Sequence, residues 1–158
     1  MTLAAPRLAA LAPVLALALA LAPGCGGDPN PPNSPELYNN TVLSELGDMI
    51  STYNLQHKKP PQGVKDLAVF AESLPTGLGA ARRGDAVVLW GVAPVEPGSS
   101  GAEGQEILAY LKEAPESGGG VLTRDLQVKS LTADEFKAAP KAAGKIEDVS
   151  KAGKKKGG

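Results

Sequence analysis

The sequence contains a single cysteine, Cys25, and this limits how the chain can be held together. No disulfide can form within one copy of the chain. Because His57 is the only histidine, a metal site built on several Cys and His side chains is also excluded. Arg7 precedes an apolar run, Leu8–Ala22, that is shorter than the roughly 20 residues that span a bilayer. Charge, apolar run and small residues in this order are typical of a secretory signal peptide, here residues 1–24.

The stretch Ala22-Pro23-Gly24-Cys25 resembles the lipobox of bacterial lipoproteins. The resemblance implies cleavage between Gly24 and Cys25 and a diacylglyceryl group on the Cys25 thiol, with a further acyl chain such as palmitate on the new amino group. Two or more acyl chains hold a protein stably on a membrane, whereas one binds reversibly. The motif departs from the usual pattern, because Leu21 lies one place too early. An ordinary signal peptide that leaves a free thiol, and a retained transmembrane helix, remain as alternatives.

Composition divides the rest of the chain into three parts. Residues 25–35 are dense in proline and glycine, which predicts a tether. Residues 36–139 leave room for one small domain of about 100 residues. Residues 140–158 carry six lysines against Glu147 and Asp148, and are predicted to be disordered because they have almost nothing to bury. This Lys-rich tail is either merely solvated or attracted to anionic cell-wall polymer or lipid. Nucleic acid is not expected, because no aromatic side chains lie between the lysines.

Apolar periodicity predicts a long helix over residues 36–57. Ser34 is the expected N-cap, Pro35 suits the first turn, and prolines at 60 and 61 prevent the helix from continuing. One face carries apolar side chains at spacings of three and four, namely Tyr38, Val42, Leu46, Met49, Ile50 and Tyr53.

The remaining elements are shorter. A second helix is expected over residues 64–72 and a turn region over 74–79. Residues 86–92 are apolar on both faces, which predicts a strand in the middle of the sheet. Residues 105–112 fit either a helix or a strand, and the Pro- and Gly-rich loops around them favour a strand. A turn over residues 114–120 is expected to follow.

The last part of the domain is predicted to form a hairpin and a helix. Residues 121–123 and 127–131 are the expected hairpin strands, joined by a bulged or longer loop because Leu126 disfavours positive φ. Thr132 and Glu135 form a capping box that opens a short helix. The predicted fold class is α+β: one main N-terminal helix and a short helix packed on a small antiparallel sheet, with a short C-terminal helix.

Two stretches resemble type II secretion pseudopilins and related pilin-like surface proteins. Residues 53–67 are similar to the segment after the long helix of that family, and residues 119–131 are similar to its closing hairpin. The resemblance implies one helix packed on a small antiparallel sheet. Leu126 stands where the family has a hairpin glycine, and a lipoprotein-like signal replaces its methylated transmembrane helix. Assembly into a filament by the family's route is therefore not implied.

No side chains in the sequence predict a catalytic, cofactor or metal site. His57 lies at a helix end with no predictable partner to orient it as a base. Asp125, Asp134 and Glu135 lie close together in the sequence, but the last two suit the first turn of a helix. The glycines at 118–120 lead into a strand, whereas a phosphate-binding loop leads into a helix.

These observations favour a lipid-anchored protein of the bacterial cell envelope, facing the periplasm or the exterior, with a non-catalytic domain for protein contact or scaffolding. The alternative is a lipoprotein that binds a solute or a glycan. Trp90 and Tyr110 are the candidate binding surface for that alternative, although the apolar neighbours of Trp90 favour a place in the core. A concave pocket lined by both rings would favour the binder, and a filled core with an open sheet edge would favour the contact domain.

Overall fold

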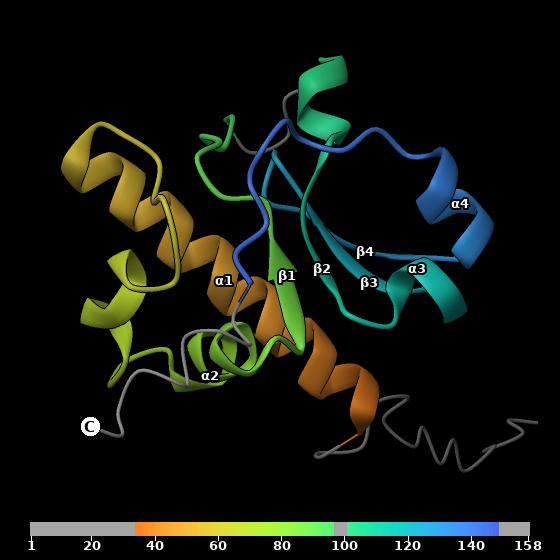
Figure 1. Cartoon of the computed structure of the whole chain (residues 1–158), viewed down its shortest axis with the longest axis horizontal. Helices are drawn as coiled ribbons and strands as arrows, with labels where there is room; N and C mark the ends of the chain where they lie inside the picture. Colours follow the sequence, from red (N-terminus) through yellow and green to blue (C-terminus); the bar gives the residue numbers. More distant parts are fainter. Residues whose placement is uncertain (1–33, 97–100, 149–158) are drawn as a thin grey trace, which may run out of the picture.

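The computed structural model of the chain describes residues 34–96 and 101–148. Within them a four-stranded antiparallel sheet has the order β1-β2-β3-β4, so each strand pairs with its neighbours in sequence. With α1 and several short helices, the fold class is α+β, as the sequence predicts (Figure 1). None of the helices in the described residues has the length and apolarity that a membrane span requires. The elements in chain order are α1 (Pro35–His57), η1 (Asp66–Phe70), α2 (Pro75–Arg83), β1 (Ala86–Val88), η2 (Ala102–Gln105), β2 (Ile107–Leu111), α3 (Ala114–Ser117), β3 (Gly119–Thr123), β4 (Val128–Leu131) and α4 (Ala133–Ala138).

Helix α1 begins and ends where the sequence predicts. The Ser34 side chain accepts a hydrogen bond from the Leu37 backbone N–H at 3.1 Å, and Pro35 occupies the first turn. The helix ends at His57, and its C-cap Lys58 adopts a left-handed conformation with φ of 55°. Of the predicted apolar stripe, only Tyr38 is substantially exposed, at 45%. The buried residues of α1 are Val42, Leu43, Leu46, Gly47, Met49, Ile50 and Tyr53.

The long helix lies directly against β3 because glycine occurs where the two elements meet. A Cβ at Gly120 would lie 2.7 Å from Leu43 Cδ1, and a Cβ at Gly47 would lie 3.3 Å from Leu122 Cδ1. Side chains at these two positions would push α1 away from the sheet. The small residues therefore set how closely the helix approaches the strands.

Each face of the sheet packs against its own apolar cluster. The larger cluster joins α1, η1 and α2 to one face and includes Leu46, Leu67, Leu78, Trp90 and Leu122. A smaller cluster joins α3 and α4 to the strands and consists of Ile107, Ala114, Val121 and Phe136, with Tyr110, Leu131 and Ala139 packed against it. Figure 1 shows α1 running behind the sheet, with α3 and α4 together at the far end of β3 and β4.

Residues 75–79 form part of helix α2 and Leu74 is its N-cap, so the prediction of a turn over residues 74–79 is wrong. Pro75 occupies the first turn and Gly84, with φ of 78°, ends the helix, a common arrangement of the two residues. Gly77 allows close contact with α1, because a Cβ there would lie 2.9 Å from the Val42 carbonyl oxygen. Proline and glycine therefore mark the ends and the packing contact of this helix.

Strand β1 is at the edge of the sheet, so the prediction that residues 86–92 form a central strand is wrong. Its regular pairing covers only Ala86–Val88. The second predicted helix is shorter than expected, since only Asp66–Phe70 form a 3₁₀ helix, and the turn after β2 contains the short helix α3. Strand β2, the hairpin of β3 and β4, and the capping box that begins α4 are confirmed.

The hairpin loop has the bulged form that the sequence predicts. The Leu126 N–H donates to the Thr123 carbonyl at 2.9 Å, and the Thr123 N–H donates to the Gln127 carbonyl at 3.0 Å. Leu126 nonetheless adopts a positive φ of 62°, the left-handed conformation that disfavours side chains. A Cβ built on Gly47 would lie 3.7 Å from Leu126 Cδ2, so this side chain lies over α1. Packing therefore offsets the strain in the loop.

Residues 140–148, called the C-terminal segment below, pack on the domain. The Ile107 N–H donates to the Pro140 carbonyl at 2.9 Å, and the Ala142 N–H donates to the Ile107 carbonyl at 2.9 Å. Ala142 is buried. Further along, Lys145 and Trp90 form an antiparallel bridge. The segment thus satisfies backbone groups at the margin of the sheet that the short strand β1 leaves unpaired.

The prediction that the domain ends at Ala139 and continues as a disordered tail is therefore wrong for residues 140–148. The segment has few apolar side chains, and its attachment comes instead from backbone hydrogen bonds and one carboxylate. Residues 149–158, the rest of the predicted tail, lie outside the described residues. So do the predicted signal peptide, Gly24, Cys25 and most of the tether.

Candidate contact site at the edge of β1

Strand β1 presents one set of backbone groups to β2. The Leu89 N–H donates to the Leu108 carbonyl at 2.9 Å, and the Lys112 N–H donates to the Asp85 carbonyl at 2.9 Å. Backbone groups of successive residues in a strand point to opposite edges. Odd-numbered residues from 85 to 89 therefore face β2, and even-numbered residues face the outer edge.

The outer edge of β1 is paired at one end only. Trp90 faces outward and exchanges two backbone hydrogen bonds with Lys145, of 2.8 and 2.9 Å. Ala86 and Val88 also face outward by the alternation of the strand. Among the described residues, neither has a backbone partner on this edge. Two N–H groups and two carbonyl groups on this edge thus lack a backbone partner, and the residues that carry them are buried, with 4% of Ala86 and 3% of Val88 exposed.

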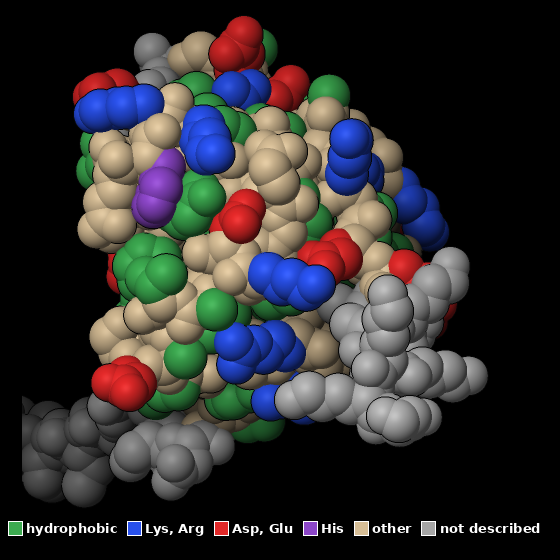
Figure 2. Space-filling view, turned by 60° about the vertical axis from the view of Figure 1, so that its left-hand side comes forward, with side chains coloured by type: hydrophobic (Ala, Val, Ile, Leu, Met, Phe, Trp, Pro, Cys, Tyr) green, Lys and Arg blue, Asp and Glu red, His purple; other side chains and the backbone are tan. Residues whose placement is uncertain are grey.

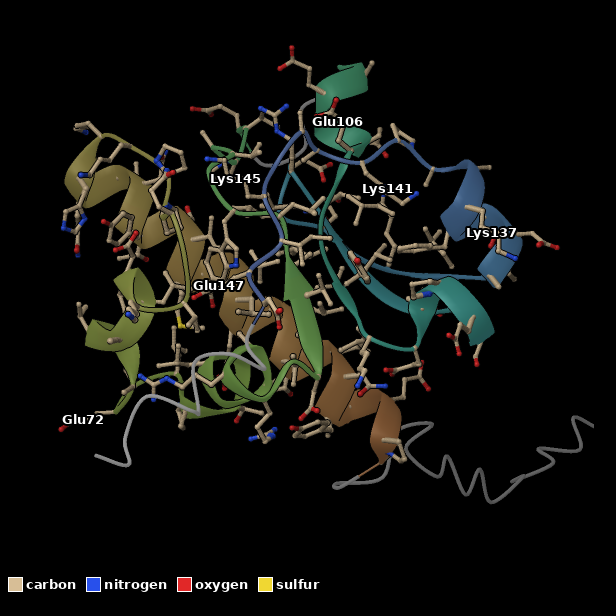
Figure 3. The ribbon with its side chains drawn as sticks, viewed as in Figure 1. Glu72, Glu106, Lys137, Lys141, Lys145 and Glu147 are labelled. Carbon is tan, nitrogen blue, oxygen red and sulfur yellow. The ribbon has the colours of Figure 1, made fainter. Side chains whose placement is uncertain are left out.

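A hollow of about 470 Å³ lies along this free edge. Helix α2 ends on one side of it, and the C-terminal segment runs past the other side, where Figure 3 labels Lys145 and Glu147. Its lining residues are Ala81, Arg82, Arg83, Gly84, Ala86, Val87, Val88, Trp90, Lys112, Ile146, Glu147 and Asp148. The hollow is therefore lined by apolar residues of the β1 region and by charged residues of α2, Lys112 and the C-terminal segment.

The charges on the rim differ in whether they are already paired. Arg83 Nε lies 2.7 Å from Asp85 Oδ2, and Arg83 also donates to the Tyr38 hydroxyl at 3.1 Å. The hydrogen bond to Asp85 raises the pKa of Arg83 above its ordinary value. Arg82 and Lys112 are exposed and have no ion-pair partner among the described residues. Glu147 and Asp148 place carboxylates on the same rim, which therefore carries charges of both signs.

On the opposite side of the hollow, Glu147 has a structural role. Its Oε2 accepts a hydrogen bond of 2.8 Å from the Val64 backbone N–H. This contact joins the C-terminal segment to the loop after α1, 83 residues earlier in the chain. Ile146, Glu147 and Asp148 line the same hollow as strand β1. Of these, Ile146 is 61% exposed.

The opposite edge of the sheet differs from the β1 edge. Strand β4 carries Lys129 at its middle, and Lys129 Nζ donates to Gln105 Oε1 at 2.6 Å. Charged side chains, lysine above all, protect edge strands from pairing with other chains. Two further hollows, of about 470 and 240 Å³, lie around the first turns of α1 and include Tyr38. Strand β4 lines none of the three hollows.

The structure does not bring Trp90 and Tyr110 together. Trp90 is buried in the cluster under α1, with 5% of its surface exposed. Tyr110 belongs to the other cluster, where its ring meets Phe136 edge-on at a centroid distance of 4.9 Å. Burial raises the pKa of the Tyr110 hydroxyl. Of these two aromatic residues, only Trp90 lines the hollow beside β1.

The polar residues considered from the sequence have local structural partners. The His57 ring stacks on Tyr53 at 4.0 Å, and Figure 2 shows this histidine, in purple, at the surface. The buried Asp125 side chain accepts a hydrogen bond from the Thr123 hydroxyl. Glu135 accepts from the Thr132 backbone N–H at 2.8 Å, and this bond lowers the pKa of Glu135. In the part of the chain that the structure describes, no three His, Cys, Asp or Glu side chains are placed to hold a metal ion.

Sequence reasoning missed the site at β1 because only the fold brings its lining residues together. One signal was present: Ala86–Val88 is an apolar strand with no charge or proline to protect it as an edge. The apolar composition predicts burial, which is confirmed for Ala86, Val88, Leu89 and Trp90, but it does not distinguish a covered edge strand from a central one. In comparisons with known proteins, no protein-family model, no curated protein and no solved structure matches this chain. The pseudopilin and lipoprotein resemblances therefore remain predictions.

Proposed function

We propose that the protein is a lipid-anchored domain of the bacterial cell envelope that acts by contacting another protein and not by catalysis. Acylated Cys25 holds it on the membrane, and the domain faces the periplasm or the exterior. The observation that carries the contact role is the hollow of about 470 Å³ beside β1, an uncharged strand at the edge of the sheet. Edge strands of this kind pair readily with other chains.

The surroundings of the polar side chains support a non-catalytic role. His57 packs on Tyr53, Glu135 caps α4, and Asp125 is bonded to Thr123 within the hairpin. Each of these three side chains thus has a local contact that accounts for its position in the fold. A general base would need a partner that orients it toward a substrate, and these three residues are spread over different elements.

The arrangement is also compatible with a pseudopilin-like scaffold, because one long helix packs on an antiparallel sheet whose strands follow in sequence order. The alternative, a lipoprotein that binds a solute or glycan between Trp90 and Tyr110, is not favoured, since the two rings belong to different clusters. A secondary contact of the lysines in residues 140–158 with anionic cell-wall polymer or lipid remains part of the proposal.

Two measurements in the bacterium that carries the protein test this proposal. The first is metabolic labelling with a clickable fatty acid, which we expect to mark the wild type and not Cys25→Ser. Equal labelling of both would exclude the lipid anchor. The second places a photo-crosslinking residue at Val87, in the hollow, or at Ser130, on β4. A discrete adduct at Val87 alone supports contact through the β1 edge, and adducts at neither position would contradict it.

A further inference from the structure

We infer that the start of α1 rests on the lipid bilayer that anchors the chain, with the side chains of Leu37 and Tyr38 at the level of the headgroups. The inference rests on the proposed lipid anchor at Cys25 and adds a fixed orientation of the domain. Three features lead to it: two exposed apolar side chains in one turn of α1, an uncharged hollow beside them, and the short length of chain between them and Cys25.

Leu37 and Tyr38 form an exposed apolar pair in the first turn of α1. Leu37 is 40% exposed and Tyr38 is 45% exposed. The other large apolar side chains that are exposed among the described residues, Leu55, Val69 and Ile146, come from three separate parts of the chain. Figure 1 shows the start of α1, in orange, at the margin of the molecule. The pair is therefore placed to meet a surface outside the domain.

A hollow of about 470 Å³, called the α1 hollow below, opens beside this pair. Its lining residues carry no charge and are Pro35, Leu37, Tyr38, Thr41 and Thr76. The hollow at β1, by contrast, has charges of both signs on its rim. An apolar surface with a few hydroxyl groups suits the boundary between lipid headgroups and acyl chains, where tyrosine is enriched.

The Tyr38 ring is held in place through its hydroxyl group. Arg83 Nη2 donates to this hydroxyl at 3.1 Å, and Arg83 Nε lies 2.7 Å from Asp85 Oδ2. The ring is therefore fixed at the surface by a group that is itself paired. Charged side chains of both signs occur around this end of the molecule, namely Glu36, Arg82, Arg83, Asp85, Lys112 and Glu113. Apolar burial, and not charge, is therefore the source of the contact.

The proposed anchor lies close to this end along the chain. Ser34, the N-cap of α1, follows Cys25 by nine residues. At no more than about 3.6 Å per residue, these residues span at most about 32 Å. Helix α1 has 23 residues and is itself about 35 Å long. The acyl chains therefore hold the first turn within reach of the bilayer and raise the concentration of lipid around it.

The single cysteine allows the anchor to be replaced chemically. In the chain that begins at Cys25, this thiol couples to a maleimide lipid in phosphatidylcholine vesicles. The protein is then tethered at the proposed point whether or not the bacterium acylates it. Failure of the inference is thus distinguishable from failure of the lipid anchor, which fatty-acid labelling tests.

Brominated lipids quench tryptophan on contact and so locate the face that meets the bilayer. Leu37→Trp places a fluorophore in the first turn of α1, and Leu55→Trp places one at the other end, where Leu55 is 64% exposed. Trp90, 5% exposed, gives both variants the same background. We expect brominated phosphatidylcholine to reduce the added fluorescence at least about twofold in Leu37→Trp and by less than about 10% in Leu55→Trp, because aromatic side chains in a membrane contact lie at the headgroups.

Hydrogen exchange tests the wild type without an added fluorophore. The Leu37 N–H donates to the Ser34 side chain at 3.1 Å, and the Tyr38 N–H donates to the Ser34 carbonyl at 3.0 Å. Tethering should slow the exchange of both groups at least about threefold, because the bilayer opposes opening of this turn. Leu37→Ser should remove the slowing, whereas the matched control Leu55→Ser should keep it. Circular dichroism establishes that each variant is folded.

Several results would overturn the inference. Equal quenching in both tryptophan variants would mean that the domain has no fixed orientation, and quenching in neither would mean that it stands clear of the bilayer. Quenching that disappears in about 1 M salt would replace apolar contact by attraction between charges. Slow exchange that appears without vesicles and increases with protein concentration would make a second copy of the chain the occupant. If any of these results occurs while the fatty acid labels the wild type, the anchor stands and only the orientation is wrong.

Discussion

At the residue scale, Gly144 shows how tightly the C-terminal segment is packed. It lies against the backbone of Leu89, where a Cβ would be only 2.5 Å from the carbonyl carbon and 2.6 Å from the carbonyl oxygen. The segment bonds to Ile107 before this point and to Trp90 after it. Gly144 thus allows the segment to pass from β2 to the outer edge of β1.

Gly144→Ala is therefore expected to destabilise the domain by about 1 to 3 kcal/mol, because the added methyl group forces the backbone to shift. The backbone atoms of Leu89 cannot move aside as the end of a flexible side chain would. Gly101→Ala is the matched control, since a Cβ at Gly101 meets nothing within 4 Å. Urea unfolding of both variants measures the difference. Equal midpoints would mean that the segment does not pass over Leu89 as the structure has it.

At the scale of the element, α1 organises the larger apolar cluster. Its buried face contacts β3 through Leu43 and Gly47, and α2 through Val42 and Glu45. The Gly77 N–H donates to Glu45 Oε2 at 2.7 Å, so a side chain of α1 satisfies a backbone donor in the first turn of α2. The position of α2, which ends beside the hollow, thus depends on α1.

The two leucines Leu46 and Leu55 test the buried face of α1 within one helix. Leu46 is fully buried, whereas Leu55 is 64% exposed. Leu46→Ala should lower the free energy of unfolding by about 2 to 5 kcal/mol, because truncation leaves a cavity in the core. Leu55→Ala makes the same chemical change at the surface and should alter it by no more than about 0.5 kcal/mol. Thermal melts of the two variants measure the difference. If both variants lose the same stability, Leu46 is not more buried than Leu55.

At the scale of the whole molecule, the C-terminal segment joins parts of the chain that are far apart in sequence. It bonds to β2 at Ile107, to the end of the β1 region at Trp90 and to the loop after α1 at Val64. The segment pairs with Trp90 on the outer edge of β1 and leaves the outward backbone groups of Ala86 and Val88 without a partner among the described residues. Stability and the candidate contact site are thus linked.

Truncation after Ala139 should therefore destabilise the protein, by on the order of 3 kcal/mol, because Ile107, Trp90 and Val64 all lose their hydrogen-bond partners. A chain ending at Asp148 keeps every one of these contacts and is the control. Hydrogen exchange adds a local readout, since the N–H groups of Ile107 and Trp90 should lose protection only in the shorter chain. Unchanged melting after truncation at Ala139 would instead favour the original prediction of a separate tail.

The sequence by itself determined the elements whose signals are local. A continuous apolar stripe predicted α1, Ser34 and Pro35 marked its start, and Thr132 with Glu135 marked the start of α4. Propensity, capping and periodicity act over a few residues, so they can be read directly from the chain. The hairpin of β3 and β4 was predictable for the same reason, although its loop holds Leu126 in a left-handed conformation.

Only the tertiary structure decided the position of β1 and the attachment of residues 140–148. The Trp90–Lys145 bridge and the Val64–Glu147 hydrogen bond join residues far apart in sequence, and mostly use backbone groups that every residue type carries. Backbone hydrogen bonds leave no pattern of side chains in the sequence. A Lys-, Ala- and Gly-rich segment that packs on the domain therefore has the same composition as one that stays disordered. The candidate site follows the same rule, because its hollow is lined by residues of α2, β1 and the C-terminal segment that only the fold brings together.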